Sequence, residues 1–379
     1  MRVLSLSLDP QVLSQTSAVT LRTARYGDAL TSFTVIVPSA QRDVVYVNKN
    51  TTVYGSGGAN KLAQFFRMVR IARKILSATS HDVVTSQDAY FLGFLAWALS
   101  SLYGCGLEIQ AHGIEKNTIL RRMLARFVLR HANSIRVVSA RLAQVLTSEY
   151  GITAKSVTVV PVHVDVTTLG VHQNYTGSES SNCELPLQQF SELYKGYFNM
   201  FSAGRLVAVK NVSMQLQAIH ALSKKFPDIR LHILGDGPLR ASLEQEAEHR
   251  GIASQVIFHG HKTGAELGVF FKACDCFVHT ADAEGYGMVI VEAAHTGLPI
   301  VTTNVGCAGE VITNEQSGII IPPRDTAALI QALTRIISDT HFRERIAAGA
   351  QLASLSIPSF DDVLQKYIES LTRAAAKGA

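Results

Sequence analysis

Two glutamates, Glu284 and Glu292, flank a short loop and the start of an apolar run, in Glu284-Gly285-Tyr286-Gly287-Met288-Val289-Ile290-Val291-Glu292. Carboxylates of this kind accept hydrogen bonds from sugar hydroxyls. The residues after Gly287 are predicted to begin a helix, and backbone N–H groups at the start of a helix attract phosphate. Nucleotide sugars present hydroxyls and phosphate together, so this segment is a candidate nucleotide-sugar site.

The position of Glu292 supports this interpretation. It lies between Val291 and Ala293 in the apolar helix pattern, where an unpaired carboxylate is costly. We therefore expect a polar group close to it. The simpler alternative is an ordinary turn with Glu284 exposed and Glu292 on a helix surface.

A second candidate lies at the end of the predicted strand 198–203, where Gly204-Arg205-Leu206 is followed by Lys210-Asn211. A glycine at a strand end lets backbone approach a ligand closely. The planar guanidinium of Arg205 and the ammonium of Lys210 both suit a diphosphate. A solvated basic turn is the alternative.

Two further strand ends carry candidate residues. The run Gly235-Asp236-Gly237-Pro238-Leu239-Arg240 has Arg240 where a dinucleotide fingerprint would need its third glycine, so alone it predicts a tight strand-to-helix turn. His112 follows the predicted strand 107–111 and precedes Gly113. It is either a ligand contact or a histidine whose hydrogen bonds are made to backbone.

The elements that must position these residues alternate along the chain, and strands separated by helices predict parallel sheets with right-handed crossovers. We expect strands over residues 3–8, 33–38, 44–48, 83–87, 107–111, 135–139, 157–161, 198–203, 230–235, 256–259, 276–280, 300–303 and 319–321. We expect helices over 61–76, 117–132, 212–226, 239–250, 265–273, 287–295, 326–337 and 360–375.

The alternation predicts an α/β fold of two Rossmann-like, doubly wound domains that face each other across a cleft. The polar, turn-rich run 174–182 interrupts the pattern. We expect an N-terminal, acceptor-side domain over 1–168, a linker over 169–197 and a C-terminal donor-binding domain over 198–358. A C-terminal helix over 359–375 is expected to pack back on the first domain.

Composition narrows the class of protein. The chain has 379 residues, 47% of them hydrophobic and 17% charged, with a formal net charge of +5. This mild excess of positive charge suits anionic ligands but not a dedicated nucleic-acid binder, so no nucleic-acid partner is expected. Five scattered cysteines fit a reducing cytosol. No signal peptide is recognised, and the apolar segment 90–103 is too short to span a bilayer, so we expect a cytoplasmic protein.

The predicted helix 117–132 is basic and amphipathic. Arg121, Arg122, Arg126 and Arg130 lie beside apolar residues such as Met123. Such a helix can rest on an anionic membrane. It can equally pack on its sheet and leave a solvated basic edge.

Taken in order, Gly204-Arg205-Leu206 with Lys210-Asn211, Gly235 to Arg240, and Glu284 to Glu292-Ala293 resemble the retaining glycosyltransferases of the GT-B fold, family 4 (glycosyl transferases group 1). The resemblance runs through Gly297-Leu298-Pro299 and Gly309-Glu310 and covers roughly residues 198–337. It is weaker in the first half. There the stretch Ser7-Leu8-Asp9-Pro10 replaces the family's glycine-rich loop, and Val162-His163 replaces an asparagine-glycine pair.

The resemblance implies a hexosyltransferase-type enzyme. It would move a sugar from a GDP- or UDP-sugar to a hydroxyl of a glycan or lipid-linked acceptor, with retention of configuration and without a metal or other cofactor. Biosynthesis of cell-surface polysaccharide or glycolipid, at the inner face of the membrane, is the implied setting. A nucleotide-sugar epimerase and a non-catalytic nucleotide-sugar-binding protein are the alternatives.

The resemblance also implies roles for individual residues. Arg205 and Lys210 would neutralise the departing diphosphate, and Glu292 would hold the ribose. Glu284 would position the transferred sugar, and His112 would contact that sugar from the other domain. The implied catalytic residues are His112, Arg205, Lys210 and Glu284. The implied donor-binding residues are Gly204, Arg205, Lys210, Gly235, Gly237, Glu284, Gly285, Tyr286, Gly287, Met288, Val289 and Glu292.

Overall fold

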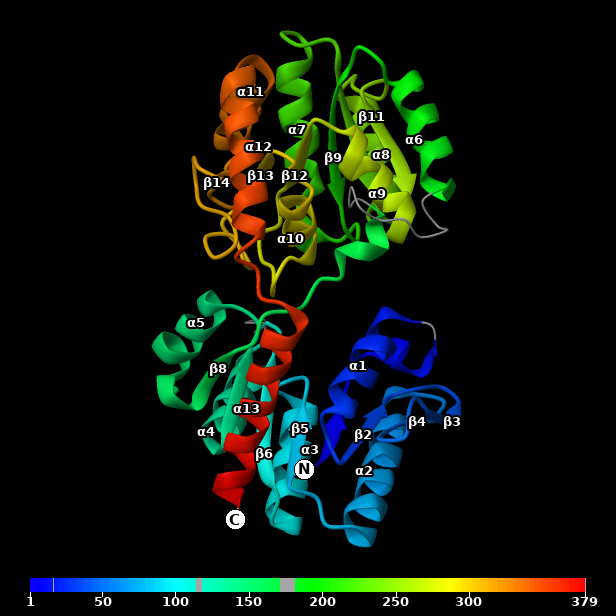
Figure 1. The fold of residues 1–379 in the computed structure, drawn as a ribbon, viewed down its shortest axis with the longest axis vertical. Helices are drawn as coiled ribbons and strands as arrows, with labels where there is room; N and C mark the ends of the chain where they lie inside the picture. The colour runs from blue at the N-terminus through cyan, green and yellow to red at the C-terminus, as the bar shows by residue number, and fades with distance from the viewer. Residues whose placement is uncertain (16, 114–117, 171–180, 379) are drawn as a thin grey trace. The chain divides into compact units, whose positions relative to one another are not determined.

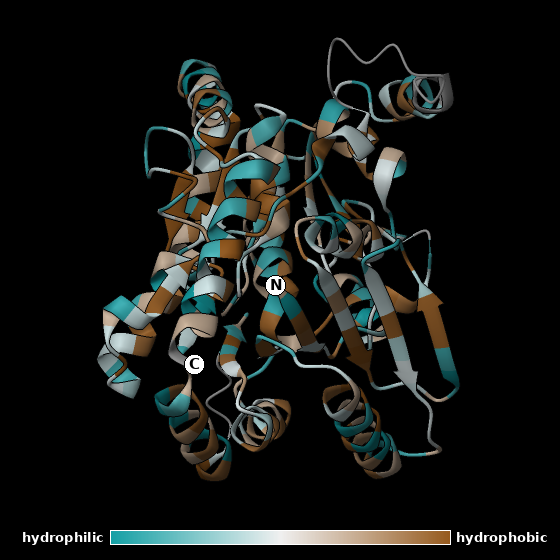
Figure 2. Cartoon of the chain, turned by 60° about the horizontal axis from the view of Figure 1, so that its bottom comes forward, coloured by the Kyte–Doolittle hydropathy of each residue, from teal (hydrophilic) through white to brown (hydrophobic). Residues whose placement is uncertain are grey.

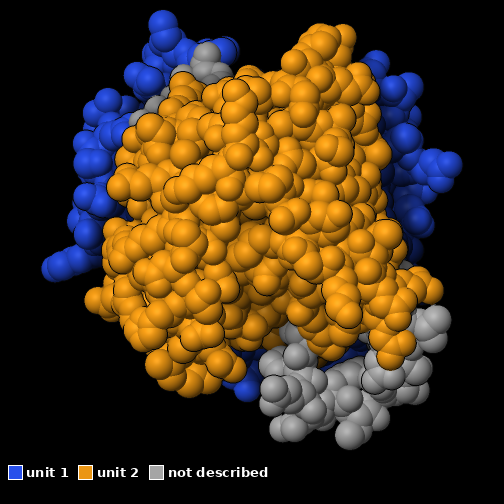
Figure 3. All heavy atoms as spheres, turned by 90° about the horizontal axis from the view of Figure 1, so that it is seen from above, with its two compact units in different colours: residues 1–161, 358–379 blue, residues 162–357 orange. Residues whose placement is uncertain are grey.

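The computed structural model describes residues 1–15, 17–113, 118–170 and 181–378. The chain forms two compact units. Unit 1 comprises Met1–Pro161 and Pro358–Ala379, and unit 2 comprises Val162–Ile357 (Figures 1 and 3). Both ends of the chain therefore belong to unit 1. Each unit is built on a parallel sheet with helices packed against it, which confirms the predicted fold class.

The sheet of unit 1 has the strand order β3-β4-β2-β1-β5-β6-β7-β8, and only the β3–β4 pairing is antiparallel among the described strands. Its strands are β1 (Arg2–Leu6), β2 (Ser32–Val37), β3 (Arg42–Tyr46), β4 (Thr51–Ser56), β5 (Val83–Ser86), β6 (Gly106–Ala111), β7 (Ser134–Val137) and β8 (Val157–Val159). Its helices are α1 (Ala18–Asp28), α2 (Lys61–Ala78), α3 (Phe91–Tyr103), α4 (Ile119–His131), α5 (Ala140–Tyr150) and α13 (Phe360–Gly378).

Helix α13 joins unit 1 through a buried polar network. The carboxylate of Glu108, fully buried on β6, accepts hydrogen bonds from Thr85 Oγ1 (2.7 Å) and from Ser370 Oγ of α13 (2.6 Å). Arg136 Nε lies 3.5 Å from the same carboxylate, and its guanidinium stacks on the ring of Tyr367. A buried charge needs such partners, so the end of the chain supplies part of what stabilises β6.

The sheet of unit 2 has the strand order β11-β10-β9-β12-β13-β14. This is the order of a doubly wound dinucleotide-binding fold, in which the chain first builds one half of the sheet and then the other. Its strands are β9 (Phe198–Ala203), β10 (Ile229–Leu234), β11 (Val256–Gly260), β12 (Cys276–His279), β13 (Ile300–Thr303) and β14 (Ile319–Ile321). Its helices are α6 (Ser181–Leu193), α7 (Val212–Ser223), α8 (Arg240–His249), α9 (Gly264–Ala273), α10 (Met288–His295), α11 (Thr326–Ser338) and α12 (Thr340–Ser354).

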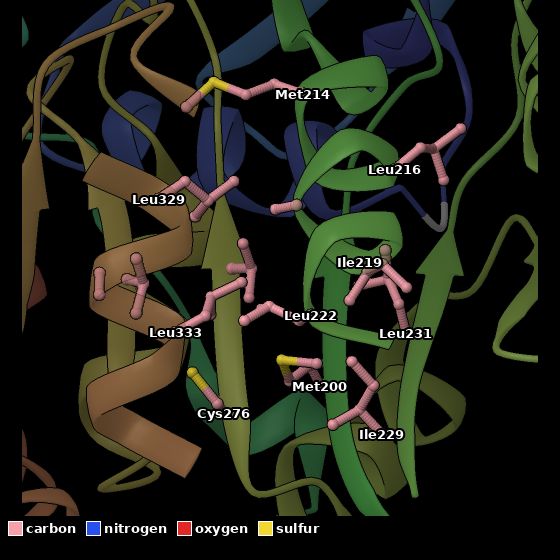
Figure 4. Close-up of a cluster of buried hydrophobic side chains, with 14 of the residues drawn as sticks. Met200, Met214, Leu216, Ile219, Leu222, Ile229, Leu231, Cys276, Leu329 and Leu333 are labelled. Atoms are coloured by element: carbon pink, nitrogen blue, oxygen red, sulfur yellow. The ribbon is translucent and has the colours of Figure 1, made fainter. Parts of the chain in front are cut away.

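One face of this sheet packs an aliphatic core. Met200 of β9 and Leu231 of β10 meet Leu222 of α7 and Leu333 of α11 (Figure 4). Successive strand residues point to opposite faces, so alternate positions of β9 and β10 enter this core. Hydrophobic residues gather along the strands, while the helices carry alternating hydrophilic and hydrophobic bands (Figure 2). This core packs the helices against the strands, and the loops of the site begin where these strands end.

The structure differs from the expected elements within the linker segment, and it contains one strand, β4, and three helices, α1, α5 and α12, that were not expected. Part of the segment expected as a linker, 181–193, forms helix α6, which packs on α9; the remainder of the polar run lies outside the described residues up to position 180. Strand β4 was missed because it follows β3 in a tight hairpin, and α12 was missed although Asp339 caps its start at 2.9 Å. Burial of Phe342 and Ile346 against the core stabilises α12.

The opposite face of the sheet is aromatic and contains a histidine pair. His232 Nδ1 of β10 lies 2.9 Å from His259 Nε2, and His232 Nε2 lies 3.1 Å from Asn199 Oδ1. The His232 side chain is fully buried, with Phe190 of α6 and Phe270 of α9 packed around it. The two imidazoles therefore share one hydrogen bond in a site that disfavours charge.

Acid is expected to destabilise unit 2 through this pair. Burial lowers the pKa of His232 to about 3 and that of His259 to about 4, from an ordinary value of 6.5. Below pH 6.5 the unfolded chain binds more protons than the folded one, so stability present above pH 6.5 is lost as the pH falls toward these values. His232 alone should lower the free energy of unfolding by roughly 2 kcal/mol between pH 7 and pH 5.

Urea unfolding followed by circular dichroism at the two pH values measures this loss. The pH dependence should shrink in His232→Gln and persist in His249→Gln, which replaces an exposed histidine of α8. An undiminished pH dependence in His232→Gln would contradict the assignment.

Candidate functional site

The candidate site lies where the strand order of unit 2 reverses. Strands β9 and β12 are neighbours, but the chain leaves β9 toward β10 on one side and β12 toward β13 on the other. The loops that follow the two strands therefore part and leave a place for a ligand at the carboxyl edge. Lys210 lies on the loop after β9, and Glu284 lies on the loop after β12.

Lys210 and Glu284 form an ion pair across this switch point. The Lys210 ammonium donates a hydrogen bond to Glu284 Oε2, and both side chains are about four-fifths buried, with 22% and 19% exposure. His279, at the end of β12, places its Nε2 3.5 Å from the same carboxylate oxygen. A small pocket lined by Gly204, Lys210, His279 and the ends of β9 and β10 adjoins the pair.

The surroundings fix the charges of this cluster. Burial by itself would raise the pKa of the Glu284 carboxyl, but the His279 imidazole and the Lys210 ammonium outweigh burial and lower that pKa to about 2. Burial lowers the pKa of His279, with Lys210 acting in the same direction and Glu284 opposing. At neutral pH the cluster therefore holds one anion, one cation and a neutral imidazole.

Hydrogen bonds to Asp282 hold the loop that carries Lys210. Asn211 adopts a left-handed conformation (φ 47°), and its side-chain amide donates to Asp282 Oδ1 (3.1 Å). Arg324 Nε donates to the other Asp282 oxygen (2.8 Å), and Asp282 N–H donates to the Val209 carbonyl (2.8 Å). The contacts with Asn211 and Val209 connect the loops after β9 and β12, and the contact with Arg324 adds the loop after β14.

Gly235 and Gly237, in the loop after β10, lie directly against the backbone of the loop after β9. A methyl group at Gly235 would lie 1.9 Å from the Gly204 carbonyl oxygen, and one at Gly237 would lie 2.5 Å from the Leu206 carbonyl oxygen. Leu206 N–H donates to the Asp236 carbonyl (2.9 Å). Gly235 and Gly237 therefore let the loop after β10 pack closely on the loop after β9.

The glycine loop ends at the start of α10. Gly287 precedes the helix with φ 92°, a conformation that favours glycine. Cys307 N–H donates to the Tyr286 carbonyl (2.7 Å), and a methyl group at Gly306 would lie 2.2 Å from that same oxygen. The first N–H groups of a helix, here those of Met288 and Val289, lack partners within the helix. The segment after Glu284 thus places anion-binding groups beside the cluster.

Glu292 lies one turn into α10 and is half-buried. Its carboxylate makes no hydrogen bond or ion pair with any residue that the structure describes. Burial raises the pKa of Glu292 to about 7, well above its usual value of 4.5. The polar neighbour expected from the sequence is therefore missing among the described residues, which leaves the carboxyl able to bind a ligand.

The remaining predicted residues are placed differently. Arg205 is exposed, and its guanidinium has no partner within the described parts of the chain. His112 directly follows β6 and is also exposed, but it belongs to unit 1, whereas Arg205, Lys210, Glu284 and Glu292 belong to unit 2. The structure pairs Lys210 with Glu284 and gives the Arg205 side chain no hydrogen bond or ion pair to either.

Sequence reasoning missed His279 and the bracing role of Asp282. His279 is 2% exposed and ends β12, five positions before Glu284. A polar residue at the carboxyl end of a buried strand was the available signal, and His112 was selected on that same signal. Gln215 was also missed: it is buried on α7 and donates to Thr280 Oγ1 at 2.8 Å, beneath the site.

The described residues include neither a candidate metal site nor a candidate membrane-spanning helix. They contain no group of three or more His, Cys, Asp or Glu side chains arranged to hold a metal ion. Among them, no helix has both the length and the apolar character to cross a bilayer.

Two protein-family models, both of glycosyltransferases, match the chain. The model of glycosyl transferases group 1 matches residues 186–352, and that of glycosyltransferase family 4 matches residues 18–168. The first match lies within unit 2. The second lies within unit 1 except for its last residues, 162–168, and together the two matches cover most of the chain. The protein therefore belongs to the group 1, family 4 glycosyltransferases of the GT-B fold.

Curated relatives match about half of the chain. Glycogen synthase of Mycobacterium tuberculosis is 31% identical over 156 residues, which is 41% of this chain and 38% of that protein. D-inositol 3-phosphate glycosyltransferase of Xylanimonas cellulosilytica is 28% identical over 218 residues, 56% of this chain and 50% of that protein. The matches span about half or less of these relatives' lengths.

Solved structures share the whole fold. The Anabaena protein Alr3699/HepE in complex with UDP superimposes with a TM-score of 0.77 at 19% identity, covering 98% of this chain and all of that one. Sucrose-phosphate synthase of Thermosynechococcus elongatus superimposes with a TM-score of 0.80 at 16% identity, covering both chains completely. At these identities the likeness concerns the fold.

Substitution of Gly306 tests whether this glycine sets the shape of the loop. Its φ of 56° and the nearby Tyr286 carbonyl mean that Gly306→Ala suffers backbone strain and a steric clash. Gly251→Ala is the matched control, because Gly251 also has a positive φ (71°) but nothing lies within 4 Å of the added methyl. Gly306→Ala should lose about 1–3 kcal/mol more unfolding free energy than Gly251→Ala.

Denaturant unfolding of the two variants gives the comparison. The Gly306→Ala chain should also show a smaller rise in melting temperature with UDP or GDP than Gly251→Ala does. Equal losses in the two variants would mean that the segment 285–287 adapts freely.

Proposed function

We propose that this protein transfers a sugar from a GDP- or UDP-sugar to a hydroxyl of a glycan or lipid-linked acceptor, with retention of anomeric configuration and without a metal. The observation that carries the proposal is the Lys210–Glu284–His279 cluster at the switch point, beside the start of α10. Membership of the glycosyltransferase family supports the reaction class. The fold likeness to a protein solved with UDP and UDP-glucose is compatible with this donor class.

Departure of the nucleotide leaves negative charge on its diphosphate, and preorganised positive groups lower the energy of that state. Lys210 is held in place by Glu284, and an ammonium has three N–H donors, so it can contact a phosphate without leaving Glu284. Arg205, exposed and unpaired among the described residues, adds a bidentate contact. The N–H groups of Met288 and Val289 face the same charge, which is why no metal is required in this mechanism.

In the proposal, the carboxyl groups of Glu284 and Glu292 bind hydroxyl groups of the donor. Glu292 has a raised pKa and no protein partner among the described residues, and the hydroxyls of the ribose would supply one. Glu284 stays ionised through its low pKa. It would accept a hydrogen bond from the donor sugar and favour positive charge developing on the reacting carbon. His279 acts through Glu284, as a positioning residue.

His112 completes the proposed set from unit 1. It follows β6 at the carboxyl edge of its own sheet, where ligands bind in folds of this kind. In the proposal it contacts the transferred sugar. With Glu284 serving for positioning and electrostatics, retention would proceed without a covalent intermediate on the protein.

Two alternatives make different predictions. A nucleotide-sugar epimerase would release a free epimer without any acceptor, so product analysis without acceptor identifies it. A non-catalytic binding protein would show a nucleotide-induced rise in melting temperature and no turnover. Arg205, which has no partner among the residues that the structure describes, and the ionised Glu284 near the start of α10 favour the transferase.

Variants of the charged residues test the mechanism. Arg205→Ala and Lys210→Ala should each lower turnover by about 10²-fold or more, because each removes a positive partner of the leaving group. Glu284→Gln should abolish most transfer while a nucleotide still raises the melting temperature, because a ligand that binds only the folded state stabilises it. Lys272→Ala, an exposed lysine of α9, is the control and should remain active.

The donor is first chosen by thermal-shift screening of GDP- and UDP-sugars, and turnover is then measured as nucleotide release with acceptor. Near-normal turnover in both cation variants would refute the roles of Arg205 and Lys210. Equal loss of nucleotide binding and transfer in Glu284→Gln would show that Glu284 is structural.

The proposed acceptor side includes contact with an anionic membrane through α4. Ile119, Leu120 and Met123 are exposed there, with 81%, 66% and 66% of their surfaces accessible. Arg122 and Arg126 are exposed on the same helix. Exposed apolar side chains beside arginines are typical of helices that lie at a membrane surface.

Sedimentation with vesicles tests this contact. The chain should bind vesicles of equimolar phosphatidylglycerol and phosphatidylcholine. A variant with Arg121, Arg122, Arg126 and Arg130 changed to glutamine should bind roughly tenfold or more weakly, since each basic residue near such a surface contributes about 1 kcal/mol. Arg335→Gln on α11 is the control. Equal sedimentation of all three chains would exclude α4 as the contact.

A further inference from the structure

Unit 1 contains a basic pocket that no step of the proposed transfer uses. It lies between the edge hairpin β3–β4 and helix α2 and has a volume of about 350 Å³. Four cationic residues, together with Ser56 and Ile71, line it: Arg42, Arg67, Arg70 and Lys74. None of the residues that line it belongs to the proposed donor set.

The sequence of α2 presents these charges on one stripe. Arg67, Arg70 and Lys74 are spaced three and four positions apart, so they lie on neighbouring turns of one helix face. Arg42, at the start of β3, lines the same pocket. It pairs with Ser56 of β4, which also lines it. Two separate elements therefore direct positive charge into one pocket.

These charges are not neutralised within the described protein. The side chains of the four residues make no hydrogen bond or ion pair with any residue that the structure describes. Helix α2 has no acidic residue, and Asp43, next to Arg42, accepts a hydrogen bond from Val44 N–H (2.8 Å). By contrast, Arg240, Arg250 and Arg335 in unit 2 each pair with a glutamate.

Four like charges around one pocket repel one another, and a bound anion removes that repulsion. The three guanidiniums offer planar pairs of N–H donors that match phosphate oxygens, and the ammonium of Lys74 adds a point charge. One negative charge would leave most of this positive charge uncompensated. The pocket therefore suits an anion with two or more charges.

We propose that this pocket is a second anion-binding site, which holds a ligand with a diphosphate or with clustered phosphate groups. Such a group occurs in soluble phosphorylated compounds and in the headgroups of anionic lipids. Exposed Leu62 and Phe66, with 67% and 63% of their surfaces accessible, precede Arg70 on α2 at four-residue intervals and so lie on a neighbouring part of the same helix face. They fit a ligand that joins phosphate to an apolar part. The site stands independently of the transfer reaction proposed for unit 2.

Arginine footprinting tests the pocket directly. The whole chain is modified with phenylglyoxal with and without inorganic pyrophosphate, and the reactivity of each arginine is read by peptide mass spectrometry. At ten times the dissociation constant, modification of Arg42, Arg67 and Arg70 should slow roughly tenfold. Arg73, exposed on the same helix but outside the pocket lining, should be unaffected.

The double variant Arg67→Gln/Arg70→Gln and the control Arg73→Gln complete the test. Protection of Arg42 by pyrophosphate should be lost in the double variant and kept in the control. Protection of Arg205 is a separate readout that belongs to the donor site, so the two proposals can fail independently.

A second arm identifies the source of the phosphate, using vesicles of equimolar cardiolipin and phosphatidylcholine in place of pyrophosphate, because the cardiolipin headgroup carries two phosphates. Protection by pyrophosphate, with equal vesicle sedimentation of both variants, supports a soluble phosphorylated ligand. Protection by vesicles, with sedimentation weakened only in the double variant, supports a lipid headgroup. No protection by either probe, or equal protection of Arg73, would overturn the proposal.

Discussion

The candidate site depends on one ion pair between residues that are 74 positions apart in the chain. Lys210 follows β9 and Glu284 follows β12, and they meet because these two strands are neighbours at the point where the sheet order reverses. Their contact lowers the pKa of Glu284 and orients the ammonium of Lys210. A strand order that separated β9 from β12 would leave two solvated charges with no shared site.

The loops that carry this pair are positioned mainly by backbone contacts. Gly235 allows the loop after β10 to pack against the Gly204 carbonyl, and Gly306 allows another chain segment to approach Tyr286. Asp282, on the loop after β12, contacts Asn211 and Val209 of the loop after β9 and Arg324 of the loop after β14. These short contacts, several of them made by the main chain, hold the loops close to one another. Such an arrangement would be preorganised for the anion in the proposed reaction.

Unit 1 depends on the end of the chain. The periodicity of 360–375 predicted an amphipathic helix, and α13 is that helix, with Tyr367 and Leu371 buried in the core of unit 1. Nothing in the local sequence indicated that Ser370 donates to Glu108, which lies 262 positions earlier. Contacts of this range follow from which strand a helix covers, and that choice depends on the packing of the whole unit.

The sequence by itself determined the local elements and the residue types of the site. Hydrophobic periodicity and glycines at strand ends predicted most of the alternating strands and helices and the motifs at Gly204, Gly235 and Glu284, but not β4 or α12. Only the tertiary structure decided which of these residues touch. It pairs Lys210 with Glu284, adds His279 and leaves Arg205 exposed. The physical reason is that strand order and burial are set by long-range packing, and they govern both distance and charge at the site.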